Sequence, residues 1–153
     1  IRLTGARRGD SYKFCPIRES SSERYRCFEI IWNCMEESME FDESLQQYVY
    51  QYEDLIFSWD EEPKEQYINK VKALAKNYKD NLDRIIDFIL PGLREMYGDI
   101  SKEDVKKNLG KPIIDYNQET VTYCDQSFDD CHIFEFAFSN NTFEKLEHFS
   151  VDG

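Results

Sequence analysis

Five cysteines and two histidines are the side chains in this chain best able to act as nucleophiles or to bind zinc. They are Cys15, Cys27, Cys34, Cys124, Cys131, His132 and His148. Their spacing matches no paired CxxC or HxxxH arrangement. Cys131 and His132 are neighbours on a predicted strand, so their side chains should point to opposite faces. The sequence therefore predicts no metal ligand and no cofactor.

Catalysis by a thiol needs a histidine base within hydrogen-bond reach of the sulfur and usually a third, orienting group. His148 close to Cys124 or Cys131 is the one pairing that fits, and nothing places either thiol at the start of a helix, where its pKa would fall. We expect no catalytic residues and no enzyme activity. A thiol- or zinc-dependent enzyme that uses Cys124, Cys131 and His148 stays as an alternative.

Motifs for other small ligands are missing as well. The acidic segment 125–130 lacks the central glycine and the distal glutamate of an EF-hand calcium loop. The chain has no GxxxxGK[ST] and no GxGxxG sequence, the usual fingerprints of nucleotide binding. An odd number of cysteines without a secretory signal favours reduced thiols, so we expect the protein in the cytoplasm.

Negative charge is the strongest signal in the sequence. The 153 residues include 31 Asp and Glu against 19 Lys and Arg, a formal net charge of −12. Residues 27–63 contain eleven acidic residues and no Lys or Arg, and residues 112–153 contain nine acidic residues and one Lys. A fold that brings these two blocks together would have one strongly negative face, which repels nucleic acid and attracts a basic protein.

Aromatic side chains lie among these acidic residues, and Tyr and Trp are favoured anchors of protein interfaces. We predict a partner-binding surface here, although for Trp59 a place in the core is slightly favoured. The surface comprises Asp54, Trp59, Asp60, Glu61, Glu62, Asp125, Asp129 and Asp130. The acidic residues could instead serve only to keep the surface solvated.

The sequence of the first third of the chain predicts an irregular arm, followed by segments with the patterns of strands or of a helix. Residues 1–26 are basic and rich in turn-forming residues, so we expect an irregular arm, and residues 27–153 should form a single domain. Phe28–Trp32 suits a strand. Residues 45–55 have apolar side chains at three- and four-residue intervals, which predicts a helix, although the alternating tyrosines at 48–52 favour a strand. Residues 56–59 should be extended.

Helical periodicity is clear in the middle of the chain. A helix is predicted over residues 63–78, with Pro63 in its first turn and its apolar side chains in one stripe. Residues 82–96 continue helically to a stop at Gly98, with a kink or break at Pro91. Ser101 should begin a short third helix that ends at Leu109, before Gly110.

From residue 113 the apolar period becomes that of strands, at 113–114, 120–123, 133–138 and 146–151. Phe134, Phe136 and Phe138 should share one face. We therefore predict an α+β fold with two or three helices packed on one face of an antiparallel C-terminal sheet. No apolar run approaches the ~20 residues that span a bilayer, so no membrane association is expected.

Several segments resemble a family of small, acidic, uncharacterised bacterial domains, some of which are similar to immunity proteins of polymorphic or contact-dependent toxin systems. The segments are 100–105, 109–113, 120–123, 127–130, 132–136 and 149–153. The resemblance covers about residues 60–153 and assigns no catalytic residue. It implies an inhibitor that binds and neutralises a basic toxin domain, such as a nuclease. A non-catalytic ligand-binding or scaffold domain is the alternative.

Overall fold

The computed structural model describes residues 39–64 and 66–153. The predicted arm and the predicted strand Phe28–Trp32 lie outside these residues. The strands are β1 (Glu40–Asp42), β2 (Gln47–Tyr52), β3 (Leu55–Trp59), β4 (Ile113–Asp115), β5 (Thr120–Tyr123), β6 (Ile133–Ser139) and β7 (Lys145–Asp152). The helices are α1 (Tyr67–Asp80), α2 (Leu82–Tyr97) and α3 (Lys102–Asn108).

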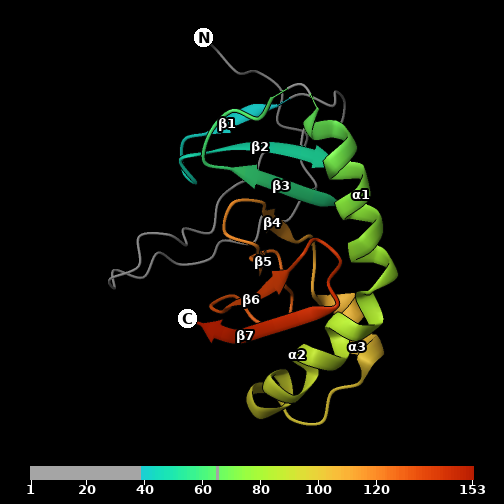
Figure 1. Ribbon diagram of the computed structural model, residues 1–153. Coiled ribbons are helices and arrows are strands. Elements are labelled where there is room, and N and C mark those ends of the chain that lie inside the picture. Colours follow the sequence, from blue (N-terminus) through green and yellow to red (C-terminus); the bar gives the residue numbers. More distant parts are fainter. Residues whose placement is uncertain (1–38, 65) are drawn as a thin grey trace.

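The seven strands form one sheet whose spatial order is the order of the sequence. Neighbouring strands are antiparallel except β3 and β4, which are parallel. All three helices lie between β3 and β4 in the chain and form the long connection that a parallel pair requires. In Figure 1, α1 lies beside β2 and β3, and α2 packs near β7. The predicted α+β fold is confirmed, with a larger, mixed sheet.

The core lies between the helices and the sheet face that they cover. Phe134, Phe136 and Phe138 belong to it, as the alternation in β6 predicted. From α1 and α2 come the side chains of the predicted apolar stripes, Val71, Leu74, Ala75, Tyr78, Ile85, Ile86, Ile89, Leu90 and Leu93. Burial of this apolar surface is the main force that holds the helices on the sheet.

The boundaries of α2 and α3 follow their predicted signals, whereas α1 begins at Tyr67, after the predicted start at Pro63. The Ser101 hydroxyl accepts from the Asp104 N–H and the Asp104 carboxylate accepts from the Ser101 N–H, so a capping box begins α3. Gly98 and Gly110 follow α2 and α3 with φ of 80° and 71°. Of the kink or break predicted at Pro91, the break is excluded, because α2 continues through that residue to Tyr97.

The predicted helix over residues 45–55 was also wrong, because β2 and β3 form a hairpin there. The alternating tyrosines were the better guide, and Ile56–Trp59 is extended as expected. Tyr52 pairs with Leu55, so the turn consists of Glu53 and Asp54, with Glu53 at φ 53°. Tight hairpin turns usually contain Gly or Asn at such a position, so the sequence carried no turn signal.

Candidate functional site

The predicted site residues lie at two ends of the sheet. Asp54 precedes β3, and Asp125, Asp129 and Asp130 lie in the loop between β5 and β6, at the same end of the sheet by strand direction. The segment 59–62 lies at the other end of β3. Strands rise about 3.3 Å per residue, so β3 separates the two groups by about 20 Å. The predicted acidic residues therefore form two groups, not one continuous face.

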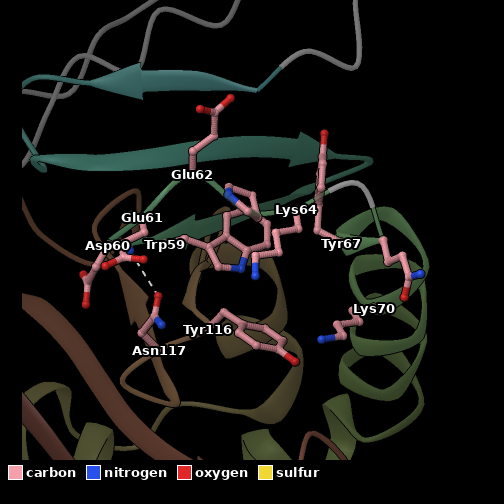
Figure 2. A pocket seen from close by; sticks show the side chains of 11 residues that line it. Trp59, Asp60, Glu61, Glu62, Lys64, Tyr67, Lys70, Tyr116 and Asn117 are labelled. Atoms are coloured by element: carbon pink, nitrogen blue, oxygen red, sulfur yellow. Dashed lines mark hydrogen bonds between the residues drawn. The ribbon is translucent and has the colours of Figure 1, made fainter.

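A pocket of about 780 Å³ opens at the C-terminal end of β3 (Figure 2). Its aromatic walls are Trp59, Tyr67 at the start of α1, and Tyr116 after β4. The Trp59 ring lies 5.7 Å from the Tyr67 ring and 6.2 Å from the Tyr116 ring, between centroids. Trp59 is only 6% exposed and also packs in the core, so its predicted core placement and a place beside the pocket are compatible.

The acidic rim of the pocket is held by hydrogen bonds between distant parts of the chain. Gln47 Nε2 donates to Asp60 Oδ1 and to Asp115 Oδ2, both at 2.8 Å. The Asp60 N–H donates to Asn117 Oδ1 at 3.1 Å. Asp115 Oδ1 accepts from the backbone N–H groups of Asn117 and Gln118 and fixes the turn after β4. The parallel pairing of β3 with β4 is what brings these groups together.

Among the described residues, the lysines of the helices form no ion pair with the acidic rim, although Lys64 and Lys70 line the same pocket. The ion pairs of the helix lysines are Lys76–Asp80, Lys79–Glu53, Lys102–Asp87 and Lys106–Asp83. Apart from Asp129, the carboxylates of the predicted surface form no ion pair within the described ranges. They are Asp54, Asp60, Glu61, Glu62, Asp125 and Asp130. Lys70 also lines the pocket, and its Nζ lies 5.9 Å from the centroid of the Tyr116 ring. Figure 2 shows Lys70 extending from α1 toward that ring, while Glu62 points the other way.

Three acids of the other group, Asp125, Asp129 and Asp130, lie in the β5–β6 loop (residues 124–132), which is organised around Asp129. Asp129 Oδ1 accepts from the N–H groups of Cys131 and His132, at 3.1 and 3.0 Å. Asp129 Oδ2 accepts from the Tyr97 hydroxyl and lies 2.7 Å from His132 Nδ1. Partial burial raises the pKa of Asp129, but these hydrogen bonds outweigh it and hold that pKa well below its usual value. Burial, followed by the bond to Asp129, raises the pKa of Tyr97.

The predicted separation of Cys131 and His132 was wrong. β6 begins only at Ile133, and the turn around Asp129 brings Cys131 Sγ to 3.4 Å from His132 Nδ1. Among the described residues, Asp129, Cys131 and His132 are the only group of three or more such side chains whose ligand atoms lie together, and neither Cys124 nor His148 belongs to it. Cys124 and Cys131 are not joined by a disulfide.

This cluster does not have the geometry of a catalytic triad. In a Cys–His–Asp triad, one imidazole nitrogen faces the thiol and the other faces the carboxylate. Here Nδ1 of His132 faces both Cys131 Sγ and Asp129 Oδ2. The thiol and the carboxylate therefore share one imidazole nitrogen, and the carboxylate does not hold the ring from the opposite nitrogen as it does in a triad.

Tyr67, Lys70, Tyr116 and Asn117 line the pocket but were not among the predicted site residues. Tyr116 and Asn117 follow an apolar pair at a turn, but nothing local joins them to residues almost sixty positions earlier. No family model, curated protein or solved structure matches the chain, so the resemblance to immunity proteins stays a prediction. Among the described residues no helix is long and apolar enough to cross a membrane.

Proposed function

We propose that this protein is a non-catalytic binding protein, an immunity-type inhibitor that neutralises a basic toxin domain by docking it at the pocket beside β3. The observation that carries the proposal is the rim of the pocket, where Asp60, Glu61 and Glu62 have no ion-pair partner in the described part of the chain. Carboxylates that form no ion pair speed association with a cationic partner and select for it, although Lys64 and Lys70 reduce the net negative charge of this pocket.

Aromatic walls next to the acidic rim suit an Arg or Lys side chain of the partner. A cation over an aromatic ring is attracted by about 0.5–1 kcal/mol at an exposed site and by more when water is excluded. The Lys70 ammonium group already lies 5.9 Å from the centroid of the Tyr116 ring, so a cation of the partner has to displace it to contact that ring. Trp59 and Tyr67 contribute rigid contact area at little cost in conformational entropy.

The direct test is capture of the partner from the native host, followed by a growth assay. The tagged full chain serves as bait, and each protein retained is identified and expressed alone and together with this chain. We expect a basic protein that arrests growth when expressed alone and is harmless in the presence of this chain. A neutral or acidic partner, or a basic partner without toxicity, would refute the immunity function.

Neutralising the rim should weaken binding of a cationic probe. We expect Glu61→Gln/Glu62→Gln to reduce the affinity for an octa-arginine peptide about fivefold and to reduce its salt dependence, since exposed charge pairs contribute about 0.2–1 kcal/mol each. Isothermal titration calorimetry at two salt concentrations measures both quantities. Asp125→Asn/Asp130→Asn is the matched control, because it removes the same charge at the other end of the sheet. Equal effects of the two variants would mean that only net charge matters.

The ring of Tyr116 should contribute separately from charge. Tyr116→Leu removes the aromatic face, and we expect it to weaken binding of the same peptide about three- to fivefold, in line with an exposed cation–π contact. Tyr116→Phe keeps the ring and should bind like the unmodified chain. If the leucine and phenylalanine variants bind equally well, the ring does not contact the probe.

A further inference from the structure

The β5–β6 loop places one sulfur, one nitrogen and one oxygen ligand atom side by side, at the end of the sheet opposite the pocket. Cys131 Sγ, a ring nitrogen of His132 and a carboxylate oxygen of Asp129 all lie within 4.8 Å of one another. Cys131 is exposed, and the His132 and Asp129 side chains are 23% and 24% exposed. All three side chains are therefore at least partly exposed to solvent.

We propose that this cluster is a binding site for a divalent metal ion of the zinc type, held by Cys131 Sγ, His132 Nδ1 and Asp129 Oδ2. A tetrahedral zinc ion with Zn–S of about 2.3 Å and Zn–N of about 2.05 Å places its sulfur and nitrogen ligands about 3.5 Å apart. The observed separation between Cys131 Sγ and His132 Nδ1 is 3.4 Å. Sulfur, imidazole and carboxylate together favour zinc over the hard, oxygen-seeking ions calcium and magnesium.

The separation between nitrogen and oxygen has to lengthen on binding. His132 Nδ1 and Asp129 Oδ2 lie at 2.7 Å, the distance of a hydrogen bond, whereas two ligands of one tetrahedral ion lie about 3.3 Å apart. The ion takes the place of the proton between them. His132 then carries its proton on Nε2, and the Cys131 thiol releases its proton to water, so that a neutral imidazole and a thiolate coordinate the ion. Water fills the fourth position.

The loop is built to keep these ligands in place. Gln126 is buried at 2% exposure, and its Nε2 donates to the backbone oxygens of Asp129 and His132, at 2.9 and 2.8 Å. Asp129 Oδ1 is occupied by the two backbone N–H groups, which leaves Oδ2 for the ion. The Tyr97 hydroxyl also donates to Asp129 Oδ2, and the Tyr97 ring stacks on Phe128 at 5.0 Å between centroids. Such outer contacts orient metal ligands and typically change affinity 10- to 100-fold.

Titration of the purified, reduced full chain with Co²⁺ tests the site, because cobalt replaces zinc and reports its ligands. We expect one cobalt ion per chain to produce the near-ultraviolet charge-transfer band of a cobalt–thiolate bond together with the intense visible bands of a tetrahedral centre. One equivalent of Zn²⁺ should abolish both. Weak visible bands without the thiolate band would overturn the proposal.

Three single substitutions assign the ligands. Cys131→Ser should abolish the thiolate band and weaken zinc binding more than about tenfold, while Cys124→Ser, the matched control within the same loop, should change neither. Tyr97→Phe should keep the band and weaken zinc binding about tenfold, since it removes only an outer contact. Circular dichroism and the melting temperature without metal establish that each variant folds. A band that survives Cys131→Ser with unchanged affinity would place the metal at another cysteine and refute the site.

Discussion

Gly110→Ala should destabilise the protein by about 4 kcal/mol, a large part of the 5–15 kcal/mol that typically holds a domain folded. Gly110 lies within the connection from α3 to β4 and has a φ of 71°, where side chains with a Cβ are strained by about 1–3 kcal/mol. A Cβ at this residue would also lie 2.3 Å from the backbone oxygen of Asp125. That oxygen belongs to the β5–β6 loop and cannot rotate away as a side chain could, so overpacking adds about 1–3 kcal/mol.

Gly98→Ala is the matched control for this prediction. Gly98 follows α2 with a φ of 80°, but a Cβ there would meet no atom within 4 Å. We expect it to cost only the backbone strain, about 1–3 kcal/mol. Urea unfolding of the two variants measures both free energies. Equal losses would mean that the approach of Asp125 to Gly110 is not rigid. Because Asn108 O accepts from the Ser127 N–H at 2.7 Å in the same contact, Gly110→Ala should also disturb the loop that carries Cys131 and His132.

Alkaline pH should destabilise the fold through a buried pair of tyrosines. The hydroxyl groups of Tyr78 and Tyr123 lie 2.6 Å apart in the core, and burial raises the pKa of both above the usual value of 10. Above pH 10 the unfolded chain releases phenol protons that the folded chain retains. The unfolded state then binds fewer protons, and the free energy of unfolding falls by up to about 1.4 kcal/mol per pH unit for each tyrosine. Below pH 10 this pair adds no pH dependence.

Substitutions within the pair separate its titration from that of other groups. Tyr78→Phe/Tyr123→Phe should remove up to about 2.7 kcal/mol per pH unit from the slope between pH 10 and 11, measured by denaturant unfolding. At pH 7 Tyr123→Phe alone should cost about 1–3 kcal/mol, because it leaves the buried Tyr78 hydroxyl without its partner. The double variant should cost less than the sum of the single variants. An unchanged alkaline slope in the double variant would show that other groups cause it.

Local sequence patterns predicted the helices and strands that bury one face and expose the other. The apolar stripes of α1 and α2, the capping box of α3 and the alternation in β6 each follow from helix or strand geometry within a few residues. The β2–β3 hairpin was not predicted because its turn, Glu53 and Asp54, lacks the Asn-Gly or Asp-Gly pair that is typical of two-residue hairpins. In addition, the apolar side chains at three- and four-residue intervals over residues 45–55 competed with the alternating tyrosines of β2, whereas residues 56–59 were correctly predicted as extended.

The sequence by itself determined the α+β class, the boundaries of α2 and α3 and the excess of acidic residues in two blocks, because composition and periodicity are local properties. Only the tertiary structure decided that β3 pairs with β4 across three helices and so joins Trp59 to Tyr116 in a pocket. It also decided that the acidic residues divide between two ends of the sheet, and that a turn around Asp129 brings Cys131 next to His132. These contacts depend on chain reversals and on long-range pairing, for which no neighbouring residues carry a signal.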